Sequence, residues 1–323
     1  MLLGDFLDAS GNSQGALRAW YQSVKGAQEA GVWLDHNSTD PAMVDLVMRH
    51  IDTLHRGQRT LLFDSFSRVR EQFGSKAMAR LDTALNGYLG DLVTVPPDSR
   101  QRPKFFFFPD LPEGPYHDAH LHDWTPGLRD AWQDMRDEAV ELLASDRDFE
   151  SFLGLKPGQD KTGYVGGTNP AASWDAFFFY RHGKRFDANH LKCPKTSKAL
   201  DSVDLCRVNN QAPEVCFSVI RPNSSIEPHY GVTNTRLVLH LPLIVPQDCA
   251  LDVIGSPAHQ WKAGEPMMFD DTFQHGAWNR SNEPRLILLM DCWNPHLTVP
   301  ERQAIQLLFN TIDDFGNIDA ASS

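Results

Sequence analysis

The strongest constraint on the fold is a series of short apolar segments between residues 174 and 293. These segments are separated by turn residues, and no long helical segment lies between them: WDAFFFYRHGKRF, VCFSVI, TRLVLHLPLIV, ALDVIG, PMMFDD and RLILLMDCW. Short strands in such a series are typical of antiparallel sheets. We therefore predict an antiparallel barrel or sandwich for this part of the chain.

The first 94 residues follow a different pattern and are predicted to be helical. Apolar residues recur there at helical spacing, for example at Leu17, Trp20, Tyr21 and Val24. The segment GALRAWYQSVKGAQEAG resembles one tetratricopeptide-type helix pair, but no second copy occurs at a period of about 34 residues. We expect a helical bundle or collar packed on the rest of the chain, in preference to a peptide-binding solenoid.

Residues 95–104, VPPDSRQRPK, are rich in proline and charge and are expected to form a linker. The predicted domains are therefore a tetratricopeptide-like helical region over 1–94 and a sheet domain over 95–323. Within the second domain, FFFFPDLPEGP (105–115) is expected to be a strand that runs into a loop. Residues 125–145 are expected to form a helix, with a proline near its start.

Composition excludes some classes of function. The chain has 30 basic and 42 acidic residues, a net charge of −12, which disfavours non-specific binding to nucleic acid. No apolar run approaches the ~20 residues of a membrane-spanning helix, and the first residues lack the features of a secretory signal. The five cysteines are scattered without a CxxC pair, as expected of a reduced, cytoplasmic protein. A single Cys193–Cys206 disulfide is left open.

One predicted strand carries polar side chains on one face only. In RLVLHL, alternation places Arg236, Val238 and His240 on one face and three leucines on the other. Ser218 takes a similar place on the preceding predicted strand, and Arg285 opens the strand RLILLMDCW. Arginine and histidine opposite a leucine face suggest a polar pocket lined by these strands.

Two histidines and an arginine suggest the chemistry of that pocket. His229 lies 46 residues before His275, which lies ten residues before Arg285. Two neutral imidazoles suit a divalent iron, and a buried arginine suits a dicarboxylate. A lone histidine is more often a structural side chain than a metal ligand. Together with the polar positions on the neighbouring predicted strands, these three residues nevertheless favour an iron oxygenase that uses 2-oxoglutarate.

The stretch from Trp174 to Thr298 resembles the aspartyl/asparaginyl β-hydroxylase family of 2-oxoglutarate-dependent oxygenases. The matching segments occur in one order: WDAFFFYRHGKR, CPKTSKAL, PHYGVTNTRLVLHLPL, WKAGEPMMFDDTFQHGAWN and PRLILLMDCWNPHLT. The resemblance implies an α+β chain whose N-terminal helical region is followed by a double-stranded β-helix, a cupin-like jelly roll, with flanking helices. It also implies that the protein uses Fe(II), 2-oxoglutarate as co-substrate, and dioxygen.

The resemblance assigns the metal centre residue by residue. His229 and His275 match the two iron ligands of the family. The carboxylate ligand of the more usual histidine–carboxylate–histidine triad is absent from the family, and here Gly231 takes its place. Asp271 matches a carboxylate that holds the metal-bound water, and it is the predicted catalytic residue. Glu227, two residues before His229, has no ligand role in the family pattern.

Other matched positions concern the co-substrate and the substrate. Arg285 matches the arginine that binds a carboxylate of 2-oxoglutarate, with Ser218 and His240 as supporting donors. Arg236 is assigned to substrate contact and Asn234 to the structure of the pocket.

One position departs from the family pattern. Relatives that act on protein domains carry an arginine two residues after Arg236, where this chain has Val238. The change removes one anchor for an anionic group. We therefore expect a difference in the substrate or in the grip on the co-substrate.

A local basic cluster stands out in this acidic protein. Between residues 181 and 198 there are six basic residues and one acid, and the six are Arg181, Lys184, Arg185, Lys192, Lys195 and Lys198. Such a cluster would suit an acidic side chain or a phosphorylated lipid. A solvated hairpin and loop is the alternative.

Three histidines close together in YHDAHLHDW resemble a metal cluster. His117, His120 and His122 alternate with aspartates in a segment that has the composition of a loop. No ligand spacing elsewhere in the chain complements them. A surface loop is therefore expected in preference to a metal site.

We therefore expect a dioxygenase that hydroxylates the β-carbon of an aspartyl or asparaginyl residue in a peptide or protein, or of a small molecule with an acidic or amide group. Hydroxylation of a lipid acyl chain is a nearby alternative. Halogenation is another, because a glycine in place of the carboxylate ligand leaves room for chloride. A non-catalytic module that binds a peptide is an alternative of a different class.

Overall fold

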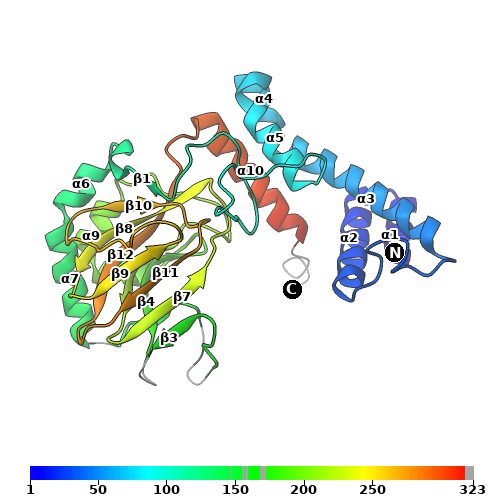
Figure 1. The fold of residues 1–323 in the computed structure, drawn as a ribbon. Helices are drawn as coiled ribbons and strands as arrows, with labels where there is room; N and C mark the ends of the chain where they lie inside the picture. The colour runs from blue at the N-terminus through cyan, green and yellow to red at the C-terminus, as the bar shows by residue number, and fades with distance from the viewer. Residues whose placement is uncertain (146, 155, 157–158, 168–171, 317–323) are drawn as a thin grey trace. The chain divides into compact units, whose positions relative to one another are not determined.

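The computed structural model describes most of the chain: residues 1–145, 147–154, 156, 159–167 and 172–316. It divides into two units, of which one is Met1–Leu92 together with the chain from Gln303 on, and the other is Val93–Arg302 (Figure 1). The last helix, α10 (Val299–Gly316), therefore groups mainly with the helices, whereas the sequence prediction assigned it to the sheet domain. Among the described residues, no helix is both long enough and apolar enough to cross a membrane.

The helical unit has a core of its own. Trp20 and Val24 of α2 pack with Leu54 of α3 and Phe315 of α10. The side chain of Asn12 caps α2 by accepting a hydrogen bond from a backbone N–H in its first turn. The other elements of the unit are α1 (Leu2–Ala9), α2 (Ser13–Glu29), α3 (Val44–Asp64), α4 (Ser67–Phe73), a 3₁₀ turn (Ser75–Met78) and α5 (Ala79–Tyr88).

The segment GALRAWYQSVKGAQEAG forms one helix, so the predicted helix pair is wrong there. All but its last two residues lie within α2. No proline interrupts the segment, and the buried residues Ala16, Trp20 and Val24 recur every four residues along one face. A single interior glycine, Gly26, costs some helical stability but does not end the helix.

The second unit contains two antiparallel sheets (Figure 1). The larger has eight strands and its order is β1 (Tyr116–His117), β10 (Met267–Phe269), β8 (Arg236–Ile244), β12 (Arg285–Trp293), β6 (Val215–Ile220), β4 (Trp174–Arg181) and β2 (Glu150–Ser151), with β5 (Lys184–Arg185) paired to β4. The smaller has four strands in the order β3 (Val165–Gly167), β7 (Ser224–His229), β11 (His275–Asn279) and β9 (Cys249–Val253). The predicted fold class, helices followed by an antiparallel double-stranded β-helix with flanking helices, is confirmed.

The larger sheet is buried on both faces. On β8, Leu237, Leu239 and Leu241 belong to a core that also contains Leu128 and Met135 of the covering helices. These helices are α6 (Thr125–Asp130), α7 (Trp132–Ser145), α8 (Asp187–Lys192) and α9 (Pro194–Leu200). Burying one leucine in such a core stabilises the fold by roughly 1.5–3 kcal/mol.

The opposite face of the larger sheet turns toward the smaller sheet. Val238 of β8 and Ile220 of β6 share a core with Leu251 and Val253 of β9 and Ala277 of β11. The predicted alternation along these strands is therefore confirmed: leucines face the helices, and the polar positions face the space between the sheets.

Two local predictions differ from the structure. Residues 105–108 form only an isolated bridge, between Phe106 and Thr233, instead of a strand. The side chain of Asn234 accepts from the backbone N–H of Phe108 and donates to its carbonyl, both at 2.8 Å, so these groups cannot join a ladder. The predicted helix over 125–145 is interrupted at Ala131 and becomes α6 and α7. All five cysteines are free, so the Cys193–Cys206 disulfide does not form.

Candidate active site

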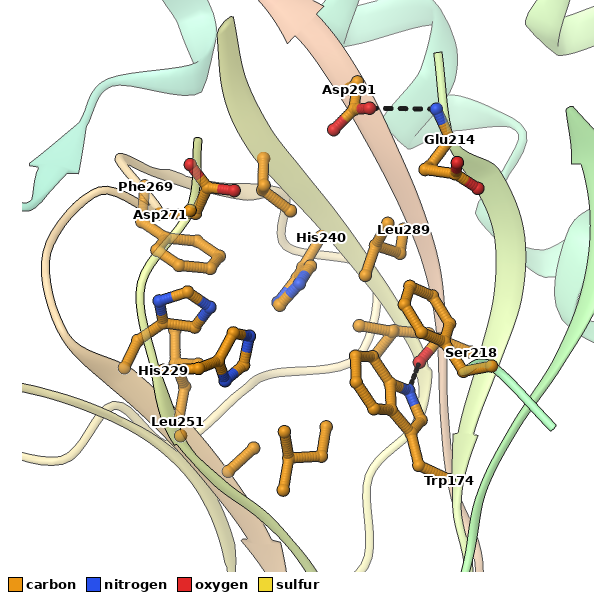
Figure 2. Close-up of a pocket in the computed structure, with 18 of the residues that line it drawn as sticks. Trp174, Glu214, Ser218, His229, His240, Leu251, Phe269, Asp271, Leu289 and Asp291 are labelled. Atoms are coloured by element: carbon orange, nitrogen blue, oxygen red, sulfur yellow. Dashed lines mark hydrogen bonds between the residues drawn. The ribbon is translucent and has the colours of Figure 1, made fainter. Parts of the chain in front are cut away.

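A cavity of about 280 Å³ lies between the two sheets (Figure 2). Side chains from β6, β8 and β12 line it on one side, and side chains from β7, β9 and β11 on the other. Most of the lining is apolar, with a few polar groups, as is usual for small-molecule sites. The cavity brings together every site residue predicted from the sequence: Ser218, His229, Arg236, His240, Asp271, His275 and Arg285.

The two predicted metal ligands face each other across neighbouring strands. His229 ends β7 and His275 begins β11, and the two residues are partners in the strand register. Their ring centroids are 4.2 Å apart. Among the described residues, no group of three or more histidine, cysteine or acidic side chains could hold a metal ion. The protein therefore offers two imidazoles here and no carboxylate ligand beside them.

The hydrogen bonds of both rings fix the tautomer that a metal requires. Nδ1 of His229 lies 2.9 Å from the carbonyl of Glu227, and Nδ1 of His275 lies 3.0 Å from the carbonyl of Phe273. A carbonyl only accepts, so each Nδ1 carries a proton, and in the neutral form of such a ring the lone pair is on Nε2. Burial lowers the pKa of His275 to about 3, so this ring is neutral at physiological pH.

The space beside Gly231 is filled by the carboxyl group of Asp271. A Cβ built on Gly231 would lie 2.1 Å from Cγ and Oδ1 of Asp271, far inside contact distance. The absence of a side chain at Gly231 is therefore what lets this carboxyl group approach the two imidazoles. Asp271 is 7% exposed, and among the described residues its Oδ1 has no hydrogen-bond partner. Burial raises its pKa. Such an oxygen is able to accept a hydrogen bond from a water molecule held at the metal position.

Glu227 points away from the cavity. Its Oε1 lies 3.2 Å from Oγ of Ser225 and would be 2.1 Å from a Cβ on Gly166 of the neighbouring strand β3. The side chain therefore lies on the outer side of the smaller sheet. It does not join His229 as a ligand.

Arg285 is a buried cation for which the described part of the chain provides no carboxylate partner. Its Nη1 donates a long hydrogen bond of 3.4 Å to the carbonyl of Ser218, and among the described residues its Nε has no partner. Its guanidinium lies 4.8 Å from the centroid of the Trp261 ring. Burial lowers its pKa to about 9. A buried charge left in this state is costly unless a bound anion compensates it.

Two neighbouring side chains are oriented as further donors. Nε1 of Trp261 donates to Nδ1 of His240 at 3.2 Å, and because an indole N–H only donates, the proton of His240 must be on Nε2. Burial lowers the pKa of His240 well below its usual value, so the ring is neutral. Nε1 of Trp174 likewise donates to Oγ of Ser218 at 2.9 Å, which leaves the hydroxyl hydrogen free to donate elsewhere (Figure 2).

Arg236 is held by carboxylates of the protein itself. It forms a short ion pair with Asp291 and a second one, at 3.5 Å, with Asp271. The backbone N–H of Glu214 donates to the other oxygen of Asp291 at 2.9 Å (Figure 2). Neither Asp291 nor Glu214 was predicted as a site residue. The signal for Asp291 was present, because a lone carboxylate inside the apolar strand RLILLMDCW needs a buried partner.

The predicted basic cluster is largely neutralised. Four of its members form ion pairs: Arg181 with Glu150, Arg185 with Asp187, Lys192 with Asp148 and Lys195 with Asp134. Lys184 and Lys198 are exposed. A cluster with this pairing behaves as a solvated surface more than as an anion site.

The three clustered histidines are not all at the surface. His120 is exposed, as expected, but His122 is buried and stacks on Trp124 with ring centroids 4.6 Å apart. His117 is half-buried, 6.5 Å from the ring of His296. Among the described residues, these histidines belong to no group of three or more possible metal ligands.

Comparisons with known proteins find similarity to beta-hydroxylases and to proteins with a beta-hydroxylase domain. A family model described as aspartyl/asparaginyl beta-hydroxylase matches residues 129–295. Aspartate beta-hydroxylase domain-containing protein 2 of Mus musculus is 31% identical over 270 residues, which cover 80% of this chain and 73% of that protein. Aspartyl/asparaginyl beta-hydroxylase of Homo sapiens is 26% identical over 195 residues, 56% of this chain and 24% of that protein.

Among solved structures, a Pseudomonas putida prolyl-4-hydroxylase is similar over 51% of this chain and 86% of that chain. The sequence identity is 12% and the TM-score is 0.30. A likeness at this level supports no argument about function.

Proposed function

Because the chain belongs to the aspartyl/asparaginyl β-hydroxylase family, we propose that it is an Fe(II)- and 2-oxoglutarate-dependent dioxygenase. Its reaction is the hydroxylation of a β-carbon of an aspartyl or asparaginyl residue or of a related small molecule. One observation carries the proposal: two imidazoles whose Nδ1 atoms face backbone carbonyls line the same cavity as a buried guanidinium that has no carboxylate partner among the described residues.

The donor set suits ferrous iron. Nε2 of His229 and Nε2 of His275 would hold the metal, and two protein ligands leave most of the coordination sphere to the co-substrate and water. Asp271 would accept a hydrogen bond from a water molecule there through its unpartnered Oδ1.

The opposite wall suits 2-oxoglutarate. Arg285 would bind a carboxylate of the co-substrate, and the Oγ–H of Ser218 and Nε2–H of His240 would donate to the same group. Iron and 2-oxoglutarate, when bound, supply the activation of dioxygen. The protein's own contribution is to bind the co-substrate, orient the substrate's C–H bond and exclude water by its apolar lining.

Hydroxylation is favoured over the other reactions considered for this sequence. Halogenation would require a chloride beside Gly231, but the Asp271 carboxyl group fills that space. A non-catalytic peptide module would leave the buried, unpaired Arg285 without a role. Hydroxylation of an acyl chain stays an alternative, since apolar residues form most of the cavity lining.

The direct test is turnover by the purified protein with Fe(II), ascorbate and 2-oxoglutarate. Free aspartate and asparagine, peptides that contain either residue, and a lipid with hydroxylatable acyl chains are the candidate substrates. We expect succinate formation coupled to the gain of one oxygen atom on one candidate, measured by mass spectrometry. Calorimetric titration with Zn(II) and 2-oxoglutarate gives a readout that does not depend on turnover. Absence of both metal and 2-oxoglutarate binding would overturn the proposal.

A further inference from the structure

The two ends of the cavity differ in charge. On β12 the residues that face the cavity are Arg285, Ile287, Leu289 and Asp291, so the arginine and the aspartate are six residues, or about 20 Å, apart along the strand. Arg285 therefore marks one end of the cavity and Asp291 marks the other. The register places His240 opposite Leu289, near the middle.

Three acidic groups meet at the Asp291 end. Val238 pairs with Asp291 and Arg236 pairs with Trp293 in the register, so Arg236 also lies at this end. Figure 2 shows the carboxyl groups of Asp271, Asp291 and Glu214 on the side of the cavity away from Ser218 and Trp174. Because the co-substrate is assigned to the Arg285 end of the cavity, the substrate that reacts is assigned to the Asp291 end.

The only cation lining this end is already paired. Among the described residues of the lining, the two arginines are Arg236 and Arg285, and Arg236 forms ion pairs with both Asp291 and Asp271. Val238, which points into the same space, offers no charge. A substrate carboxylate placed directly against these three acidic groups would be repelled, and the described lining offers no unpaired cation there to compensate it.

Glu214 lines the cavity and its carboxyl group has few partners in the described part of the protein. Among the described residues, His182 alone donates to its carboxyl group, through the backbone N–H at 2.8 Å and with Nδ1 2.9 Å away. Burial raises the pKa of Glu214 to about 7, and a bound cation would lower it again. Oδ1 of Asp271 is buried in the same cavity, and the proposed function already assigns this oxygen to a water molecule at the metal position, so Glu214 is the carboxylate left for the amine.

We propose that the substrate carries a protonated primary amine that binds the carboxylate of Glu214, and that it is a free amino acid or an amino-terminal residue. The inference rests on the proposed function. In aspartate and asparagine the α-ammonium is attached to the carbon next to the β-carbon, so an amine at Glu214 is compatible with reaction at that position. The cavity of about 280 Å³ must also hold the co-substrate, which favours a compact substrate group.

The test compares ligands in which this nitrogen is a charged amine with ligands in which it is a neutral, acetylated amide. L-Asparagine is paired with N-acetyl-L-asparagine, and a short peptide that begins with asparagine is paired with its N-acetylated form. Binding is measured on protein loaded with Zn(II) and 2-oxoglutarate, which prevents turnover, by the fluorescence of Trp174 and Trp261 in the lining. We expect the amine form to bind at least about tenfold more tightly in one or both pairs. The pair with the larger ratio identifies the source of the amine.

Variants test whether the preference for ligands with a free amine depends on Glu214. Glu214→Gln should remove the preference, because the amide can still accept from His182 but carries no charge. Glu265→Gln, the same change at an exposed glutamate outside the cavity, should leave it intact. Val238→Arg places a cation in the same space and should weaken the amine ligands, so it tests the proposal even if Glu214→Gln does not fold.

Three results would overturn the inference: N-acetylated ligands that bind as tightly as free amines, no binding of any amine ligand, or a preference unchanged in Glu214→Gln. If 2-oxoglutarate itself does not bind to the zinc-loaded protein, the proposed function fails instead. If 2-oxoglutarate binds and the capped ligands bind equally well, the proposed function stands and this inference alone is wrong.

Discussion

The two sheets face the same cavity but differ in what covers their other side. The eight-stranded sheet is packed on helices α6, α7 and α9 and carries the positions assigned to the co-substrate, Ser218, His240 and Arg285. The four-stranded sheet has an outer surface groove lined by Glu227, Trp278 and other residues, and it carries the two imidazoles. The proposed anion site therefore lies on the eight-stranded sheet, which is buried on both faces, whereas the proposed metal ligands lie on the four-stranded sheet. We expect the free energy of unfolding to depend mainly on the eight-stranded sheet. A bound metal should stabilise the four-stranded sheet.

The largest expected effect on activity comes from removing an imidazole from the four-stranded sheet. His275→Ala should reduce 2-oxoglutarate turnover to background, because one ring cannot retain the iron, while the fold survives on the larger sheet. Succinate formation, metal content and thermal unfolding are the measurements. His120→Ala, at an exposed histidine, is the control. Turnover at the wild-type level in His275→Ala would remove the metal assignment.

Arg285→Leu, in the eight-stranded sheet, should have opposite effects on 2-oxoglutarate binding and on the stability of the ligand-free protein. Loss of the buried charge should cost about 2–5 kcal/mol in 2-oxoglutarate binding. The same change should stabilise the ligand-free protein by about 1 kcal/mol or more, because an unpaired buried guanidinium is replaced by an apolar group. Calorimetry and thermal unfolding measure the two quantities. An unchanged affinity would contradict the co-substrate assignment.

Paired truncations compare the stability of the two sheets directly. Leu288→Ala removes a fully buried side chain from the helix-covered face of β12 and should lower the free energy of unfolding by about 2–5 kcal/mol. Trp278→Ala removes a half-buried side chain from the outer face of β11 and should cost clearly less. Urea unfolding of metal-free protein gives both values. Equal decreases in the free energy of unfolding would mean that the two sheets contribute equally to stability.

Gly231→Ala tests how closely the carboxyl group of Asp271 is fitted to the metal site. The new Cβ would overlap the carboxyl group and displace it. Metal affinity or turnover should fall about 10–100-fold, the usual cost of disturbing a group that orients a metal centre. Gly127→Ala, where a Cβ meets nothing within 4 Å, is the matched control. If both variants behave like wild type, Asp271 has no such role.

The smallest effect concerns His122, on the helix-covered side near β12. Burial lowers its pKa from 6.5 to about 4, so between these pH values the unfolded chain binds a proton that the folded protein does not. Stability should therefore fall as the pH falls from 6.5 to 4. His122→Phe should remove about 1–3 kcal/mol of that dependence, measured by urea unfolding at several pH values. An equally steep dependence in the variant would mean that other groups cause it.

The difference in burial between the two sheets also explains which strands could be predicted from the sequence. β6 and β12 are continuous apolar runs because both of their faces are buried, so their positions were predicted correctly. β7 (SSIEPH) and β11 (HGAWN) have a solvated face, a proline and a glycine, and neither was among the predicted strands. His229 and His275 were identified by the family resemblance and their spacing, not by strand periodicity.

Pairings between distant residues were not predictable from local pattern. Asn234 binds the backbone of Phe108, which turned an expected strand at 105–108 into an irregular segment. The pairing of Arg236 with Asp291 depends on two strands that meet only in the folded sheet. Local sequence identifies which residues are polar or apolar, whereas the compensation of each buried charge is decided by the fold.

The fit between Gly231 and Asp271 also bears on how this centre can evolve. Glycine and aspartate codons can differ by a single nucleotide, so a conventional carboxylate ligand at position 231 is one mutation away. While Asp271 keeps its present place, that new side chain would overlap it. Such a substitution becomes tolerable only after position 271 has changed, and that change by itself disturbs the group proposed to hold a water molecule. Mutual dependence of this kind is epistasis, and it would keep the proposed centre at two protein ligands by hindering the gain of a third.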